Sequence, residues 1–290
     1  MGRVMESVTA TIHESRLAVK DGTELFIRDW IIEGAGEQDP KPCVVILHGL
    51  GEHCGRYRHI AGFLNGCGFS VRTYDHRGHG QSGGARADLP EPGTIVSDAE
   101  ILINDFAEKC RTVPILFGHS MGGLFAAHIA TAGLVRLRGL VLSSPALALR
   151  LTGLDRFLLR IMSSVAPHFA ISNGLNSANL SHDPAVATAY DNDPLVHKKV
   201  TASLLNGMLT SIAYVESHAP VLSVPTLLQV AELDLLIDPQ GSHHFYEGLP
   251  SNLGTAHFYP GMYHEIFNES DAKQVFDDLK DWLASRNFFN

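Results

Sequence analysis

A serine between two glycines, placed where an apolar strand would give way to a helix, constrains this chain more than any other feature. Residues 113–123 read VPILFGHSMGG and precede a run rich in alanine and leucine. A nucleophilic serine on such a sharp turn needs small neighbours, because adjacent backbone must pass close by, and Gly118 and Gly122 are those neighbours. The start of the helix would point its amides at a developing oxyanion. We therefore predict that Ser120 is a nucleophile; the alternative is a glycine-rich turn with an ordinary serine.

Short apolar runs alternate with helical patterns along the chain. The expected strands are 8–17, 25–30, 43–47, 69–74, 115–118, 140–143, 226–230 and 256–259, and the expected helices include 95–110, 121–132 and 272–283. This alternation predicts an α/β fold with a mostly parallel, doubly wound sheet. A chain of 290 residues is long enough to build one substantial core around it.

The interval 147–219 interrupts this rhythm, because it carries helical and loop signals but no convincing strand. Apolar residues recur at helix spacing in two places, Leu151 to Ile161 and Leu204 to Ile212. Ligands of open α/β sheets bind beyond the strand C-termini, where such an insertion would lie. We expect a helical cap at 147–219 over a core made of 1–146 and 220–290. The alternative is that these helices pack on the sheet.

Composition and charge exclude several classes of protein. The net charge of −9, with no basic cluster, argues against a nucleic-acid partner. The first 15 residues lack the apolar region of a secretory signal, and no apolar run approaches the roughly 20 residues of a membrane helix. The four cysteines match neither a CxxC nor a zinc pattern. We therefore expect a cytoplasmic protein with reduced thiols and no metal. Cys54 is of interest because its loop is expected to face the active site.

A second glycine-containing loop follows the expected strand 43–47 and reads HGLGEH over residues 48–53. Enzymes with a serine on this kind of turn take a second oxyanion donor from such a loop. The amide of Leu50 is the candidate, paired with that of Met121, and His48 is expected to brace the loop. A phosphate-binding loop is excluded because no GK[ST] follows the glycines.

A serine nucleophile needs a base, and the base needs an acid to orient it. In this fold the acid follows the serine in the chain and the histidine comes last. Asp234 lies just past the expected strand 226–230, where the acid belongs. Glu232 and Asp238 are its rivals.

The base should follow the last strand, and His264 lies between that strand and the final helix. The chain has 16 histidines, so position has to decide among them. His257 falls within the strand, and His243 and His244 fall in the preceding helix. We expect these three to serve packing or the surface.

Several segments together resemble one known family. Residues 48–57 (HGLGEHCGRY), 75–82 (DHRGHGQS) and 118–123 (GHSMGG) resemble HGxGEHSGRY, DxxGHGxS and GHSMGG of monoacylglycerol lipases, and Tyr190 with 193–195 is similar to a cap segment of that family. The match is scattered over most of the chain. It points to the monoacylglycerol lipase and lysophospholipase-like group of the α/β-hydrolase superfamily, of the serine aminopeptidase S33 type.

The resemblance implies hydrolysis of a small ester with one acyl chain, an acyl tunnel under the cap and no cofactor. It carries over Ser120, Asp234 and His264 as the triad. In vertebrate members a Glu, a Tyr and a second His contact the glycerol hydroxyls, and Glu52 and Tyr190 match the first two. Phe267 stands at the place of that His. A preference for simpler alkyl esters, or for an aromatic alcohol or acid portion, becomes more credible.

The start of the expected cap, residues 146–165, carries a wide apolar stripe. Such a stripe is more often core than lipid-facing surface. In a cap both readings can hold, because part of it could line an acyl pocket or make transient contact with a lipid interface.

The sequence thus predicts a carboxylic ester hydrolase that acts through an acyl-enzyme. The alternatives are a general carboxylesterase or a lysophospholipase, with monoalkyl aromatic esters among the substrates. A ligand-binding protein with a dead site is the rival from another class, because fold does not dictate function. The retained Ser, Asp, His and both glycines argue against it.

Overall fold

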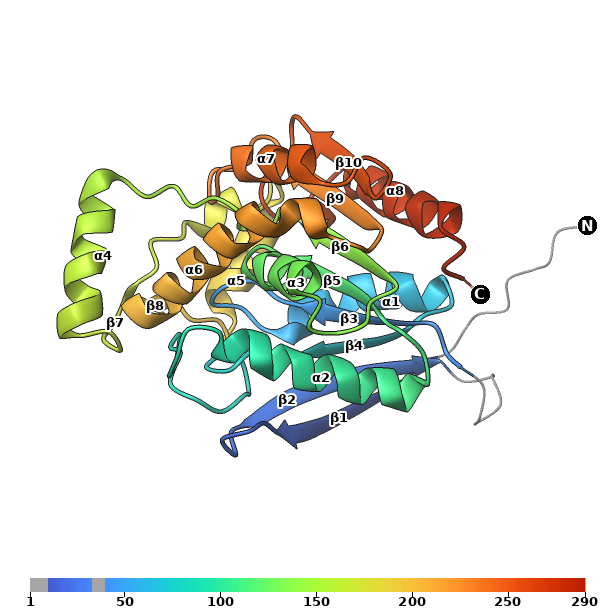
Figure 1. The fold of residues 1–290 in the computed structure, drawn as a ribbon, viewed down its shortest axis with the longest axis horizontal. Helices are drawn as coiled ribbons and strands as arrows, with labels where there is room; N and C mark the ends of the chain where they lie inside the picture. The colour runs from blue at the N-terminus through green and yellow to red at the C-terminus, as the bar shows by residue number, and fades with distance from the viewer. Residues whose placement is uncertain (1–9, 33–39, 290) are drawn as a thin grey trace, which may run out of the picture.

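Residues 10–32 and 40–289 are described by a computed structural model, and an eight-stranded sheet forms their centre (Figure 1). Its strand order is β1-β2-β4-β3-β5-β6-β9-β10. The strands are β1 (Ala10–Ala18), β2 (Glu24–Ile32), β3 (Cys43–Leu47), β4 (Ser70–Tyr74), β5 (Ile115–His119), β6 (Gly139–Ser143), β9 (Thr226–Ala231) and β10 (Gly254–Tyr259). Strand β2 is antiparallel to β1 and β4, and every other neighbouring pair is parallel. The prediction of a mostly parallel sheet is confirmed; Val8 and Thr9 of the expected first strand lie outside the described residues.

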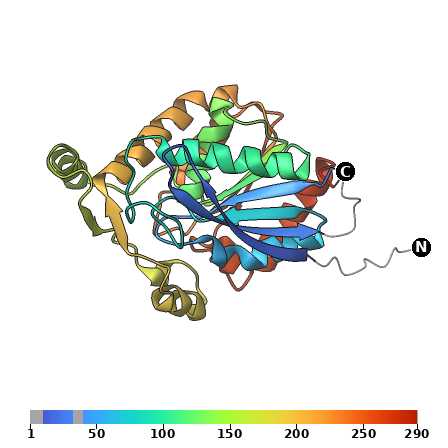
Figure 2. The ribbon, with the colours of Figure 1, turned by 90° about the horizontal axis from the view of Figure 1, so that it is seen from below.

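Helices cover both faces of the sheet, as a doubly wound fold requires (Figures 1 and 2). One hydrophobic cluster contains side chains of α2 (Thr94–Cys110), α3 (Met121–Ala132), α6 (Ala202–His218) and α7 (Gln240–Gly248), and the other contains side chains of α1 (Arg58–Gly66) and α8 (Ala272–Ser285). Strand β3 shows the alternation, because Val45 and Leu47 belong to the first cluster and Val44 and Ile46 to the second. Burial on both faces explains why the strand is an unbroken apolar run.

The interval between β6 and β9 differs from expectation in one respect. It contains α4 (Gly153–Val165), β7 (Ala170–Ser172), α5 (Pro184–Asn192), β8 (Lys199–Thr201) and α6. Strands β7 and β8 form a separate antiparallel pair. The expectation that this interval has no strand was therefore wrong. Each of the two strands has three residues, which is too short for an alternating pattern to show in the sequence.

The helices of this interval are placed differently from one another. Helix α6 lies against α3, where the rings of Tyr214 and His128 stack with centroids 4.4 Å apart, and its Leu204 and Met208 belong to the first core cluster. Helix α4 has no buried residue and projects from the edge of the molecule (Figure 1). Packing on the core, the alternative raised for this interval, thus describes α6 but not α4.

A buried ion network joins the antiparallel part of the sheet to α2. Arg72 of β4 donates from Nε and Nη2 to the two carboxylate oxygens of Asp29 of β2, at 2.8 and 2.9 Å. Its Nη1 also donates to Asp105 of α2, at 2.5 Å. Both Arg72 and Asp29 are almost fully buried, and Lys109 is the other cation on Asp29. Each charge therefore depends on its partner for solvation.

We predict that Arg72→Ala lowers the free energy of unfolding by about 3 kcal/mol, because it leaves Asp29 buried with Lys109 as its one remaining cation among the described residues. Urea denaturation followed by circular dichroism measures the loss. Lys273→Ala is the control, because it removes an exposed ion pair with Asp277 and should cost about 0.5 kcal/mol or less. Equal losses in the two variants would contradict the prediction.

Candidate active site

Ser120 lies at the turn between β5 and α3, in a backbone conformation that side chains rarely adopt. Its φ is 54° and its ψ is −120°. Both of its peptide groups are held, because its amide donates to the Ser143 carbonyl at 3.0 Å and its carbonyl accepts from the Ala146 amide at 2.9 Å. A strained residue of this kind costs about 1–3 kcal/mol, so the surrounding structure must impose it.

The two glycines beside Ser120 are required by close backbone approach. A Cβ on Gly122 would lie 2.3 Å from the Leu47 carbonyl oxygen, and a Cβ on Gly118 would lie 2.5 Å from the Gly122 carbonyl oxygen. Neither position leaves room for a side chain, since the obstructing atoms are backbone. The glycines thus allow β3, β5 and α3 to meet at the serine.

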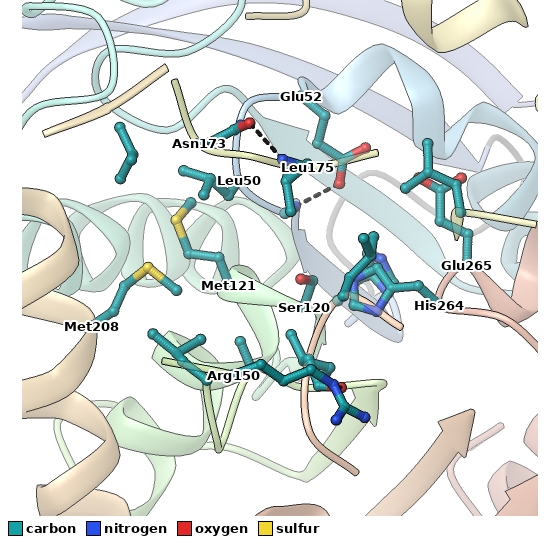
Figure 3. A pocket seen from close by; sticks show the side chains of 18 of the residues that line it. Leu50, Glu52, Ser120, Met121, Arg150, Asn173, Leu175, Met208, His264 and Glu265 are labelled. Atoms are coloured by element: carbon teal, nitrogen blue, oxygen red, sulfur yellow. Dashed lines mark hydrogen bonds between the residues drawn. The ribbon is translucent and has the colours of Figure 1, made fainter. Parts of the chain in front are cut away.

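Asp234 and His264 meet from two further strand ends. Asp234 follows β9 and His264 follows β10, and His264 Nδ1 lies 2.6 Å from Asp234 Oδ2. The other carboxylate oxygen of Asp234 accepts from the amides of Leu236 and Ile237, at 2.8 and 3.0 Å. Both side chains are almost fully buried. His264 and Ser120 line the same cavity (Figure 3).

The pair shifts the pKa of both of its members. Burial lowers the pKa of His264, but the charge of Asp234 and the hydrogen bond to it outweigh burial and leave that pKa above its usual 6.5. Burial raises the pKa of Asp234, but His264 and the two amides outweigh burial and leave it below its usual value. The arrangement therefore favours a charged carboxylate beside the imidazole.

The rival acids and bases have other partners. Glu232 Oε1 lies 2.7 Å from His243 Nε2, and Asp238 accepts from the Gln240 amide. Of the other candidate bases, His257 lies 3.5 Å from Asp278 and His244 lies 3.9 Å from Glu216. His264, the partner of Asp234, lines the cavity with Ser120, and none of the alternative acids and bases lines it.

The loop after β3 places Leu50 beside the serine. A Cβ on Gly49 would lie 3.3 Å from the Ser120 Cβ, so the loop and the turn are in contact. No hydrogen bond among the described residues has the Leu50 or the Met121 amide as donor, and both residues line the cavity. His48 bonds through Nδ1 to the Gly49 carbonyl at 2.7 Å and accepts through Nε2 from the His76 amide at 2.9 Å. It braces the loop, as expected.

Glu52 lines the cavity, but both of its oxygens are engaged. Oε1 accepts from the Gly49 amide and from the Tyr57 hydroxyl, each at 2.6 Å, and Oε2 accepts from Arg56. Burial raises the pKa of Glu52, but Arg56 and nearby histidines outweigh burial and lower it to about 2. Arg56 also binds Glu265, the neighbour of His264, at 2.6 and 2.8 Å. Glu52 thus stabilises the loop as a charged group.

The cavity has a volume of about 200 Å³. Ser120, His264, Glu52 and Arg56 lie on one part of its wall, and much of the rest is apolar. Residues of the interval 147–219 supply most of the apolar wall: Leu149, Leu151, Leu175, Leu180, Val200, Leu205 and Met208. Figure 3 shows Met208 and Leu175 on this wall near Ser120.

Two polar groups of the cavity wall have no partner among the described residues. Tyr190 is buried and its hydroxyl is unpaired; Asn173 also lines the cavity, with its Nδ2 unpaired (Figure 3). Both atoms would lie 3.4 Å from a Cβ on Gly51, so they belong to one region. The sequence indicated Tyr190 through the resemblance. No pattern marks Asn173, which follows the short strand β7.

One expectation near the site needs correction. Phe267 does not line the cavity with Ser120; it packs between Phe117 and Phe276 in the second core cluster, with ring centroids 5.6 and 4.9 Å apart. The turn after His264 directs it into that cluster. The loop that leads to Cys54 does line the cavity, through Gly49, Leu50 and Glu52, but Cys54 itself is not among the lining residues. Its side chain is buried, and burial together with Asp75 raises the pKa of its thiol.

Two kinds of feature are absent from residues 10–32 and 40–289. No group of three His, Cys, Asp or Glu side chains is arranged to hold a metal ion. No helix combines the length and the apolar character needed to cross a membrane.

Comparisons with known proteins give a consistent family. The family model described as "Serine aminopeptidase, S33" matches residues 38–271. The monoacylglycerol lipase of Mycolicibacterium smegmatis is 34% identical, over 96% of this chain and 99% of that protein. The monoglyceride lipase of Rattus norvegicus is 32% identical, over 92% of this chain and 88% of its own length. The crystal structure of Paleococcus ferrophilus monoacylglycerol lipase superposes with a TM-score of 0.78 at 30% identity, covering 95% of this chain and 99% of that one. With its mostly parallel sheet and a serine on a strained strand-to-helix turn, the chain belongs to the serine aminopeptidase S33 family of α/β-hydrolases.

Proposed function

We propose that this chain hydrolyses carboxylic esters that carry one acyl chain, monoacylglycerols in particular. One observation carries the proposal: His264, paired with the buried Asp234, lines the same cavity as Ser120, Leu50 and Met121, and the amides of Leu50 and Met121 have no acceptor among the described residues. A nucleophile, an oriented base and oxyanion donors are the set that acyl transfer requires.

In the proposed mechanism His264 takes the proton of Ser120 as the hydroxyl attacks the ester carbonyl. The Leu50 and Met121 amides bind the oxyanion, and such a donor contributes about 3 kcal/mol at the transition state. The intermediate collapses, and the alcohol leaves with the proton from His264. Water then attacks the acyl-enzyme in the same way. Asp234 holds the imidazole tautomer and stabilises its charged form.

The cavity wall supports a substrate with one apolar and one polar end. The leucines and Met208 suit an acyl chain, while the unpaired Tyr190 hydroxyl suits an alcohol group. Glu52 is engaged by the loop, so we assign the contact with a glycerol hydroxyl to Tyr190, with Asn173 beside it. Relatives named as monoacylglycerol or monoglyceride lipases support the same substrate class.

We further propose that residues 147–219 form a cap and that α4 contacts lipid surfaces. Leu154, Phe157 and Val165 of α4 are 65%, 60% and 77% exposed. An exposed apolar stripe of this kind marks an interaction surface, and an amphipathic helix can lie in a lipid interface. The capping box between Thr152 and Asp155 supports the helix where little packing does.

A cytoplasmic location is also part of the proposal. Its support is the state of the four cysteines, which are unpaired thiols. Thiols persist in reducing compartments.

Ser120→Ala should lower kcat by on the order of 10⁴-fold or more, because the nucleophile is lost while the oxyanion donors remain. Turnover of a monoacylglycerol and labelling by a fluorophosphonate probe measure the effect. Ser217→Ala, a change at an exposed serine of α6, should keep full activity and full labelling.

The same assay tests the substrate class. Wild type is compared on a monoacylglycerol, a lysophospholipid, a monoalkyl aromatic ester and a p-nitrophenyl ester chain-length series. We expect the highest kcat/KM on the monoacylglycerol. A wild type that neither labels nor cleaves any of these esters would refute hydrolysis, and a preference for another ester would refute the substrate.

The kcat/KM should rise with pH, with a midpoint above 6.5, because His264 acts as a base only when neutral and Asp234 raises its pKa. Glu265, Glu52 and His119 are the other groups around it. Burial and His264 lower the pKa of His119 to about 4, so its titration lies well below this limb. Asp234→Asn should move the midpoint to lower pH than in wild type, since the largest effect that opposes burial is then lost, and lower kcat by about 10⁴-fold.

His244→Asn is the matched control for this profile. His244 is exposed, so the profile of this variant should equal that of wild type. A midpoint in Asp234→Asn that equals that of wild type would contradict the assignment of the limb to the Asp234–His264 pair.

The double variant Leu154→Ser, Phe157→Ser should bind anionic lipid vesicles at least about tenfold more weakly. Each substitution removes apolar side-chain surface that would otherwise be buried in the lipid interface. Vesicle co-sedimentation measures binding. Hydrolysis of soluble p-nitrophenyl butyrate should stay unchanged. Leu134→Ser, at an exposed leucine after α3, is the control and should bind like wild type. Unchanged vesicle binding in the double variant would count against a lipid-contacting α4.

A further inference from the structure

Arg150 lies in the stem between β6 and α4 and reaches the loop that carries Asp234. Its Nε donates to the Ile237 carbonyl and its Nη2 to the Asp234 carbonyl, both at 3.0 Å. The residue also lines the cavity that Ser120 lines, and Figure 3 shows it on the cavity wall. None of the motifs that identify the nucleophile, base or acid includes it.

The two carbonyls belong to the turn that orients the acid. Within residues 234–237 the amides of Leu236 and Ile237 bind the Asp234 carboxylate, while the carbonyls of Asp234 and Ile237 accept from Arg150. One planar guanidinium therefore holds both ends of the turn whose amides hold the carboxylate. Bonds from a charged donor are stronger than neutral ones, and the rigid fork of arginine fits two acceptors at once.

Backbone contacts fix the stem against the same loop. The Asp238 amide donates to the Ala148 carbonyl at 3.1 Å. A Cβ on Gly241 would lie 2.6 Å from the Ala148 nitrogen, so the two segments touch without an intervening side chain. Arg150 therefore starts from a fixed main chain two residues from this contact.

We infer that Arg150 is a positioning residue that keeps Asp234 within hydrogen-bond reach of His264. This inference rests on the proposed function. Without Arg150 the 234–237 turn has two carbonyls free to turn toward water, and the carboxylate that the turn carries shifts with it. A displacement of about 1 Å at a catalytic group can cost 100-fold in rate. His264 Nδ1 and Asp234 Oδ2 lie 2.6 Å apart, so a displacement of the carboxylate away from the imidazole lengthens and weakens this hydrogen bond.

The test uses the full chain with Arg150→Met and Arg150→Lys, assayed on soluble p-nitrophenyl butyrate. We expect Arg150→Met to lower kcat/KM by about tenfold to 100-fold. The midpoint of the acid limb of its pH profile should move to lower pH, because Asp234 then raises the pKa of His264 less. Arg150→Lys should fall between wild type and Arg150→Met, since one ammonium cannot reach both carbonyls as the fork does.

Arg138→Met is the matched control, because Arg138 is a half-buried arginine that donates to a main-chain carbonyl, that of Asn287, remote from the site. It should keep the wild-type rate and midpoint. Thermal unfolding of each variant shows that the fold is retained, and Arg150→Lys carries the test if Arg150→Met does not fold.

A double-mutant cycle separates positioning from direct contact with substrate. In an Asp234→Asn background Arg150→Met should lower activity less than about threefold, because the group it positions is already gone. The inference is overturned by unchanged activity in Arg150→Met, by an unmoved midpoint, by full activity in Arg150→Lys, or by the same loss in both backgrounds. A wild type that neither labels with fluorophosphonate nor cleaves ester would be a failure of the proposed function, which is a different result.

Discussion

The positive φ of Ser120 is the constraint on which the rest of the site depends. The conformation is unfavourable for a residue with a side chain, so it exists only because the neighbouring structure leaves no other. Gly118 and Gly122 let three backbone segments meet there, and hydrogen bonds to Ser143 and Ala146 fix both peptide groups. The strained conformation of Ser120 has two geometric consequences. The side chain reaches the cavity, and the next amide of the chain is left without an acceptor within the described structure.

Around this turn, buried charges are arranged in partnered sets. Asp234 faces His264, while Arg56 lies between Glu52 and Glu265. Burial alone would raise the pKa of Asp234 and of Glu52, and the charged and hydrogen-bonding groups around these two carboxylates lower it instead. The pKa values of these carboxylates therefore depend on the contacts that their side chains make with neighbouring groups.

Much of the fold could be predicted from the sequence, because its signals are local. The apolar run of β3 and the GxSxG turn are read from neighbouring residues, and the order of strand ends then singles out Asp234 and His264, which the structure brings together. The failures are non-local. Phe267 was placed by counting from His264, but the turn after that histidine directs it into the core. The strands β7 and β8 are too short to show a period. Asn173 and Arg150 act through contacts that no spacing reveals, because their neighbours come from other parts of the chain.

Arg56 joins two carboxylates: Glu52, four residues away on the loop after β3, and Glu265, 209 residues away beside His264. A chain still emerging from the ribosome contains the serine turn long before it contains Glu265. Until the last strand is in place, Arg56 lacks its contact with Glu265, and Ser120 lacks the proposed base, His264. The proposed reactive centre is therefore complete only once the last strand and the residues after it have joined the sheet.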